Sequence, residues 1–292
     1  MTIAQVILNG LLLGGLYACT AIGFSIIWGV MNLVNLAHGS MIVIGAYVTY
    51  LVSSQTGADP FLTIPLAGAI LFLLGYLLQR FLINLIVRSS VFMTFIFTFG
   101  LDMLLINVLL IAFSADLRSL SVSYAHESFR LGGLAAPYGR LIAFALAIAL
   151  TIALSFFLDH TRTGRAIKAV SFDRDAAALS GIDINRIYAL TFAIGAMMAG
   201  MAGSLIAVVY SFSPVTGESF TMKAFVIVVL GGLGSVPGAI LGGVVLGVAE
   251  NMASYLLDPG YRDAIGFGLL LLTLMFRSEG LLGKRFFAEV KG

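Results

Sequence analysis

The start of the chain carries no charge, and this feature limits its possible folds more than any other. No lysine, arginine, aspartate or glutamate occurs before Asp59, and residues 3–31 are predominantly apolar. A membrane-spanning helix needs about 20 apolar residues, so this run is long enough to cross a bilayer. Because the first basic residue is Arg80, the start lacks the basic region of a cleaved signal peptide. We therefore expect residues 3–31 to be a retained span.

The composition extends this conclusion to the whole chain. Hydrophobic residues make up 60% of the sequence and charged residues only 10%, whereas soluble domains carry about 25% charged residues. So few charges cannot solvate a water-facing surface, which argues against a large soluble core. The net charge of +2 does not suggest a nucleic-acid surface, and the single cysteine, Cys19, offers no disulfide or CxxC metal motif. We predict an all-α, polytopic transmembrane bundle that forms one domain over residues 1–292.

Eight segments of this bundle can be outlined from the apolar runs. Met41–Val52 is short for a full pass, and Ala224–Leu257 is too long for one and is interrupted by GGLGSVPG (Gly231–Gly238). We therefore predict about eight membrane segments, with broken or re-entrant helices near 29–53 and 224–257. The six regular runs are Ile3–Met31, Phe61–Val87, Val91–Phe113, Leu141–Leu158, Ile187–Tyr210 and Ala264–Phe276.

The basic residues give an orientation, because loops rich in lysine and arginine stay in the cytoplasm. Eleven of the sixteen basic residues lie in the loop 159–186, in the C-terminal tail, or beside the turn at Arg80 and Arg88. If these regions are cytoplasmic, 114–140 is an external loop. Counting passes with both broken segments included then predicts that both termini are cytoplasmic.

Two polar or glycine-rich interruptions are candidates for a translocation route. Non-helical backbone at membrane depth is tolerated only inside protein or along a wet cavity. Interrupted segments in corresponding places of two halves indicate a transporter site, and free N–H groups at the following helix starts suit a substrate carboxylate. These residues either contact substrate or only satisfy frayed backbone and join helices. The candidates are Asn32, Asn35, His38, Gly39 and Ser40 in NLVNLAHGS, and Gly231, Gly232, Gly234, Ser235, Pro237 and Gly238 in GGLGSVPG.

Two acids, Asp102 and Glu250, fall within the apolar runs. Charge at the bilayer centre is expensive and usually marks a pathway or a pair. Glu250 is near the end of its run, where interfacial solvation explains it, and Asp102 serves either a structural hydrogen bond or transport. Small residues repeat every fourth position at Gly195, Ala199, Gly203 and Ala207, which predicts close helix packing in lipid.

The loop TRTGRAIKAVSFDRDAAALSGIDINR is longer than a connection needs, and its sequence predicts structure. Ser171 or Asp173 can cap a helix over 174–179, and Gly181 suits its end. A second short turn fits 165–170. Such a helix has little apolar area of its own. Docking onto a cytoplasmic partner explains it better than a free, solvated loop helix does.

These residues carry a family resemblance. GRAIKAVSFDRDAAALSGI resembles the cytoplasmic loop of permeases of the LivH branched-chain amino-acid family. The match continues in NLAHGSMIVIGAY, in KAFVIVVLGGLGSVPGAILGGVVLGVAEN, and in YRDAI and FRSEGLLG, so it spans nearly the whole chain.

The resemblance implies a permease of an ATP-binding-cassette importer in the bacterial inner membrane. Its partners would be a second permease (a LivM-like paralogue or a second copy), two cytoplasmic ATPases that bind the ATP, and a periplasmic substrate-binding protein. Substrates in the family are leucine, isoleucine and valine, with relatives that take other amino acids, amides or organic acids. By position, the ATPase-coupling residues would be Gly164, Arg165, Ala166, Lys168, Asp173, Ala176, Ala177 and Gly181.

Other functions find less support in the residues. The chain has no GxxxxGK[ST] phosphate loop, and Pro237 interrupts the apparent GxGxxG pattern, so we expect no nucleotide cofactor in this chain. Neither a metal-ligand cluster nor a nucleophile with a base can be recognised, and we expect no enzymatic activity. An ion-coupled secondary transporter is the main alternative, but it needs coupling carboxylates and only Asp102 is well placed.

Overall fold

The computed structural model describes residues 2–87, 89–120, 122, 124, 127–131, 133–277 and 279–282. Helices dominate these residues, with one antiparallel pair of short strands that joins Ser128 to Pro137 and Leu131 to Leu134. The elements are α1 (Ile3–Met31), α2 (His38–Thr56), η1 (Pro60–Thr63), α3 (Ile64–Phe81), η2 (Ile83–Leu85), α4 (Val91–Phe113), β1 (Ser128–Leu131), β2 (Leu134–Pro137), α5 (Tyr138–His160), α6 (Arg162–Phe172), α7 (Arg174–Leu179), α8 (Ile184–Val209), η4 (Pro214–Thr216), α9 (Gly217–Gly231), α10 (Val236–Leu256), η5 (Pro259–Tyr261) and α11 (Arg262–Phe276).

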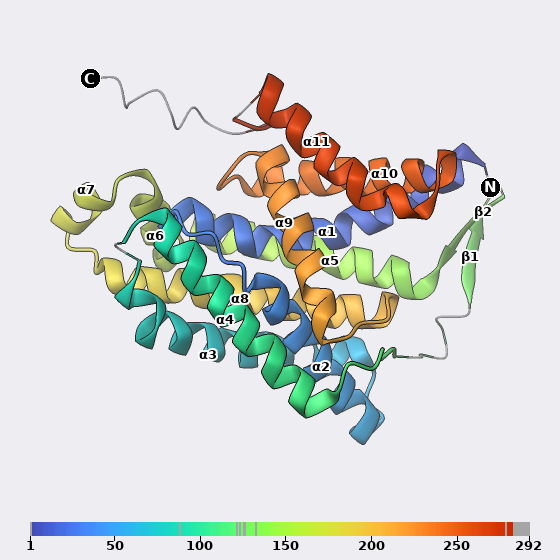
Figure 1. Cartoon of the computed structure of the whole chain (residues 1–292), viewed down its shortest axis with the longest axis horizontal. Coiled ribbons are helices and arrows are strands. Elements are labelled where there is room, and N and C mark those ends of the chain that lie inside the picture. The colour runs from blue at the N-terminus through green and yellow to red at the C-terminus, as the bar shows by residue number, and fades with distance from the viewer. Residues whose placement is uncertain are drawn as a thin grey trace.

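The predicted membrane bundle is confirmed. Among the described residues, seven helical stretches are long and apolar enough to cross a membrane, and they contain α1, α3, α4, α5, α8, α9 and α10. The shorter or less apolar α2 and α11 complete the bundle (Figure 1). The helices are interrupted at both predicted places: residues 32–37 separate α1 from α2, and residues 232–235 separate α9 from α10.

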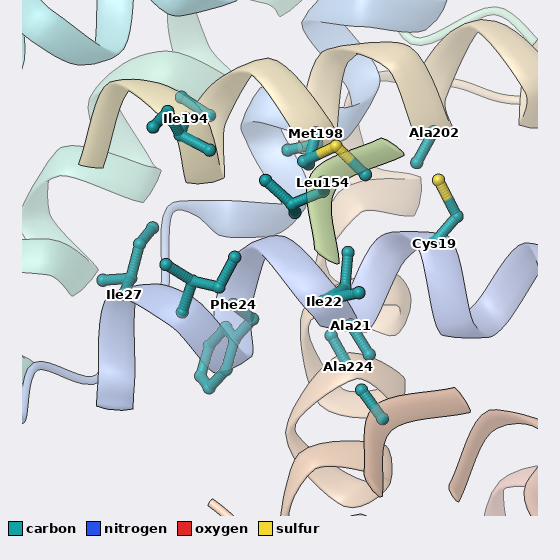
Figure 2. Packing of buried hydrophobic residues seen from close by; sticks show 14 of the residues in the cluster. Cys19, Ala21, Ile22, Phe24, Ile27, Leu154, Ile194, Met198, Ala202 and Ala224 are labelled. Atoms are coloured by element: carbon teal, nitrogen blue, oxygen red, sulfur yellow. The ribbon is translucent and has the colours of Figure 1, made fainter. Parts of the chain in front are cut away.

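Helix α1 lies at the centre of the bundle because its sequence is apolar on every side. A helix that is hydrophobic all round has no polar face for water and is buried. It packs against α5, α8, α9 and α10. Figure 2 shows how its side chains fill the space: Cys19 points toward Ala202 of α8, and the neighbouring residues approach Met198 of α8, Leu154 of α5 and Ala224 of α9.

Glycines allow α1 to approach α10 at backbone distance. A Cβ atom on Gly14 would lie 2.7 Å from the Cα of Val244, and one on Gly10 would lie 2.6 Å from the Cα of Val248. No hydrophobic effect joins helices in lipid, so this close van der Waals contact is what holds them. The residue numbers rise along α1 as they fall along α10, so the two helices are antiparallel.

The two halves of the bundle are related by inversion, a question that the sequence leaves open. In the first half a long helix, α1, is followed by a non-helical stretch, by α2 and by α3; in the second half α8, α9 and α10 follow the same order. The long helix of each half packs on the last helix of the other half, α1 on α10 and α8 on α3. Because α1 and α8 run in opposite directions, the repeat is of the inverted kind that transporters use.

The structure contradicts the expectation that both termini lie on the side of loop 159–186. The side chain of Gln5 donates to the carbonyl of Ala135 in β2 at 2.7 Å and accepts from its N–H at 2.8 Å. The opposite end of α1 lies beside α6, as Figure 1 shows. The N-terminal end of α1 therefore shares the side of the predicted external loop. The pass count is wrong because residues 32–56 complete a full crossing. Leu282 lies at the α6 end, and residues 283–292 are outside the described residues.

We predict that Gly14→Leu destabilises the bundle, whereas Gly100→Leu does not. The new side chain at position 14 meets the backbone of α10, and overpacking of this kind costs about 1–3 kcal/mol. Gly100 is the matched control, because nothing lies within 4 Å of a Cβ atom built on it. Thermal unfolding in detergent, followed by the fluorescence of the single tryptophan, Trp28, measures the difference. Equal unfolding temperatures for the two variants would contradict the packing argument.

Candidate functional site

The first interruption, NLVNLAHGS, returns the chain from the end of α1 to the middle of the bundle. Asn32 ends α1 in the left-handed conformation, with φ 50°, and its N–H bonds the carbonyl of Trp28 at 2.8 Å. Asparagine is one of the few side chains that tolerate this conformation. The chain continues without helical structure until α2 begins at His38.

Groups on α1, α4 and α9 satisfy the polar groups along this return. Thr98 of α4 donates to the carbonyl of Val34 at 2.9 Å, and Thr221 of α9 donates to that of Leu36 at 3.2 Å. The Nε2 of His38 lies 2.8 Å from the carbonyl of Thr20 in α1. Buried backbone groups without such partners are costly in lipid. These contacts therefore explain how a non-helical segment persists inside the membrane domain.

The starts of α2 and α9 meet at this point. The N–H of Gly39 donates to Thr221 Oγ1 at 2.8 Å, and a Cβ atom on Gly39 would overlap the carbonyl of Gly217. Beside them, the hydroxyl of Ser40 donates to the carboxylate of Asp102 at 2.5 Å. Two helix starts, each with a positive dipole end, thus converge with a carboxylate and two hydroxyls around them.

This meeting point lies near mid-depth of the membrane domain. Asp102 is the twelfth of the 23 residues of α4, so it is equally far from both ends of that helix. Thr20, which contacts His38, lies 17 residues from the start of the 29-residue α1. Both residues are at least 11 residues from either end of their helix. We refer to the group Gly39, Ser40, Asp102, Gly217 and Thr221 as the mid-depth junction.

The predicted route residues of the first interruption are buried in this conformation. The side chains of Asn35, His38 and Ser40 have no exposed surface, whereas Asn32 is exposed at the end of the bundle. Within the described residues, His38 Nδ1 and Asn35 Oδ1 have no hydrogen-bond partner. His38 also meets Phe24 edge-on, with ring centroids 5.5 Å apart. Asn35, His38 and Ser40 are thus packed around the first turn of α2.

The second interruption, GGLGSVPG, does not occupy the corresponding place. It forms the turn between α9 and α10 at the α6 end of the bundle, where Gly234, Ser235 and Pro237 line a cavity of about 450 Å³. Gly231 and Gly238 let the two helices touch, and the hydroxyl of Ser235 caps α10 by accepting from Gly238 N–H at 3.1 Å. Gly232, with φ 106°, permits the sharp turn.

The true counterpart of the first interruption is the stretch 210–216, which the sequence reading missed. It follows α8 as residues 32–37 follow α1, and it leads to the start of α9 at Gly217. The sequence gives little signal for it, because Glu218, Ser219 and Lys223 separate Gly217 from the apolar run that begins at Ala224. The expected pairing of NLVNLAHGS with GGLGSVPG is wrong, because glycine and proline mark turns as well as intramembrane breaks.

Glu250 is not explained by interfacial solvation. Its carboxylate is buried, forms an ion pair with Lys223 of α9 at 2.7 Å, and accepts from the hydroxyl of Tyr17 at 2.7 Å. Lys223 also lies 3.2 Å from Asp263 of α11. In the sequence, Lys223 is the only basic residue between Arg186 and Arg262. A single lysine in this apolar region could have indicated a partner for Glu250 inside the membrane.

The loop 159–186 is folded into two helices, as predicted. Asp173 caps α7 by accepting from the N–H groups of Asp175 and Ala176, both at 2.9 Å, and Gly181 follows its end with φ 83°. Upstream, α6 spans Arg162–Phe172 and is longer than the predicted turn. A hydrogen bond with the hydroxyl of Tyr188 raises the pKa of Arg174. This interaction connects α7 to α8.

The predicted coupling residues separate into two groups. Gly164 and Ala177 are buried, and Gly164 lets α6 pack on the end of α5, where Lys168 forms an ion pair with Asp159. The exposed group consists of Arg165, Lys168, Asp173, Ala176 and Gly181, and Ala166 is half-buried. The sequence reading missed Leu179, which is 91% exposed at the end of α7. Its signal was one large apolar side chain between Asp173 and Gly181, a stretch that otherwise holds only polar or small residues.

Comparison with known proteins gives a consistent result. The family model described as "Branched-chain amino acid transport system / permease component" matches residues 6–274. The high-affinity branched-chain amino acid transport system permease protein BraD of Pseudomonas aeruginosa is 31% identical, over 96% of this chain and 95% of its own. LivH of Escherichia coli strain K12, which has the same description, is 32% identical with the same coverage. LivM of that strain is 29% identical over 91% of this chain and 68% of its own. No solved structure matches the chain significantly.

We predict that Thr221→Val weakens the mid-depth junction and that Thr221→Ser preserves it. Valine has the shape of threonine but leaves the Gly39 N–H and the Leu36 carbonyl without this partner, at a cost of about 1–3 kcal/mol for a buried group. Serine keeps the hydroxyl. Thermal unfolding followed by Trp28 fluorescence should show a lower midpoint for the valine variant only. If both variants unfold like the natural chain, this hydroxyl does not hold the junction.

Proposed function

This chain belongs to the branched-chain amino acid transport permease family, and we propose that it forms the translocation route of a binding-protein-dependent importer. Its substrates are branched-chain amino acids or related small amino acids, amides or organic acids. It works in the inner membrane with a second, LivM-like permease or a second copy of itself. Two ATPases on the cytoplasmic side supply the energy, and a periplasmic protein delivers the substrate.

The mid-depth junction is the observation that carries this proposal. Two half-length returns, one from each inverted half, end in helix starts that meet at the centre of the membrane domain. Transporters place substrate sites near mid-depth at the interface of their repeats. A shift between the halves would open the junction to one side or the other, which is alternating access.

The α6–α7 element supports the proposed coupling to an ATPase. It projects from the bundle beyond the ends of α5 and α8, as Figure 1 shows, and it is fixed to α5 by Gly164 and by the Lys168–Asp159 pair. The exposed Leu179 at its tip offers an apolar contact to a groove on a partner. ATP-driven movement of the ATPases is then transmitted to the bundle through α5. For this movement to drive transport, the ATPases must interact more favourably with one state of the bundle than with the other.

We predict that Leu179→Asp abolishes coupling without unfolding the chain. The side chain is almost fully exposed, so a carboxylate here costs little in the isolated chain but disrupts an apolar contact with an ATPase. Uptake by vesicles that contain the complete importer should fall at least tenfold. ATP hydrolysis should no longer respond to the loaded binding protein.

Leu179→Met is the matched control for this experiment. Methionine is apolar and close to leucine in volume, so it keeps the contact that aspartate disrupts. This variant should leave uptake within about twofold of the natural chain. Normal uptake by Leu179→Asp at normal membrane levels would contradict the coupling role, and transport by this chain alone in liposomes would contradict the importer.

A further inference from the structure

A cavity of about 280 Å³ lies between α9, α10 and α11, outside the predicted route. Of the residues singled out from the sequence, only Glu250 lines it. Its charged lining consists of Glu218, Lys223, Glu250 and Asp263, and Leu246 and Phe267 are part of an apolar wall. The cavity therefore offers both signs of charge beside an apolar surface.

The charges in this cavity are arranged around the ammonium group of Lys223. Its Nζ lies 2.7 Å from Glu250 Oε1 and 3.2 Å from Asp263 Oδ1, and 5.2 Å from the centre of the Tyr17 ring. An ammonium has three N–H donors, so these two ion pairs leave one donor for a further acceptor. Glu218 also lines the cavity, so three carboxylates accompany one ammonium, and the cavity attracts a ligand that carries a positive group.

The position of Glu218 shows that this side of α9 does not face acyl chains. Glu218 is exposed on the chain and follows Gly217, which packs against Gly39 at the mid-depth junction. A carboxylate that faces lipid hydrocarbon is costly, so this surface borders water or protein. Figure 1 shows α9 crossing in front of α1 and α5. The cavity thus lies beside the junction, on a surface that acyl chains do not cover.

We propose that this cavity binds an aliphatic α-amino acid as its zwitterion. The ligand carboxylate takes the remaining donor of Lys223, its ammonium group lies between Glu218 and Asp263, and its side chain packs on Leu246 and Phe267. This inference rests on the proposed import function and narrows its substrate class, because an amide lacks both charges and an organic acid lacks the ammonium group. A purely structural Lys223–Glu250 pair would account for neither Glu218 nor the apolar wall.

Protection of a cysteine in the cavity tests the proposal. Ser219 lines the cavity and is exposed, so Ser219→Cys can be labelled with a maleimide in the purified importer complex, without the binding protein. The natural Cys19 is buried, and the unsubstituted chain gives the background. Leucine should slow labelling at least threefold. At equal concentration, 4-methylpentanoate and 3-methylbutylamine, which each lack one of the two charged groups, should slow it less.

Charge variants in the same background identify the groups that bind. Glu218→Gln and Asp263→Asn should each raise the leucine concentration needed for half-protection at least threefold. Asp116→Asn, an exposed acid outside the cavity, should leave it unchanged. Equal protection by 4-methylpentanoate and leucine, or full protection in both charge variants, would overturn the proposal.

Uptake measured in parallel separates this inference from the proposed function. ATP-driven leucine uptake together with protection by leucine supports both. Uptake without protection of Ser219→Cys overturns the cavity site and leaves the importer standing. Absence of ATP-driven uptake of any branched-chain amino acid by the complete complex overturns the proposed function on which the inference rests.

Discussion

The rest of the structure depends on how the backbone of residues 32–37 is satisfied inside the membrane domain. A bilayer offers no water to a free carbonyl, so each polar group of a non-helical segment needs a partner from the protein. Thr98 supplies one from α4 and Thr221 supplies another from α9. Helices that are far apart in sequence must therefore converge on this segment, and the convergence fixes where α2 and α9 begin.

The packing around this point divides the bundle into rigid and adaptable contacts. Two long helix pairs, α1 with α10 and α8 with α3, pack along most of their length, and glycines bring the backbones of α1 and α10 into direct contact. These pairs leave little room for sliding. The starts of α2 and α9 instead meet through one glycine pair and one threonine hydroxyl. In the proposed mechanism, the long pairs move as units and the mid-depth junction is where their relative position changes. Packed interfaces switch between discrete arrangements in this way.

Much of this architecture could be predicted from the sequence, and the failures have physical causes. Apolar runs predict spans reliably because the bilayer sets their length, and the cap at Asp173 and the stop at Gly181 follow from local backbone chemistry. The side of the membrane on which a segment lies, and its depth in the membrane, could not be predicted in the same way. The pass count treats the stretch after α1 as an incomplete crossing. Hydropathy identifies apolar helices, but it does not show that the non-helical residues 32–37 form part of a crossing. GGLGSVPG was placed at mid-depth because a glycine-rich sequence does not say whether lipid or water surrounds it.

The intramembrane charges show best what the sequence lacked. A charge in a span needs a partner or water, and each acid here meets that need differently. Asp102 accepts from Ser40, and Glu250 is paired with Lys223 and Tyr17. Those partners lie on other helices, so no spacing along the chain reveals them. Glu218, which follows Gly217 of the mid-depth junction, is exposed, and its position identifies the polar side of the bundle. In the proposed importer, the arrangement of acids, rather than the histidine of NLVNLAHGS, marks the face along which a charged solute passes.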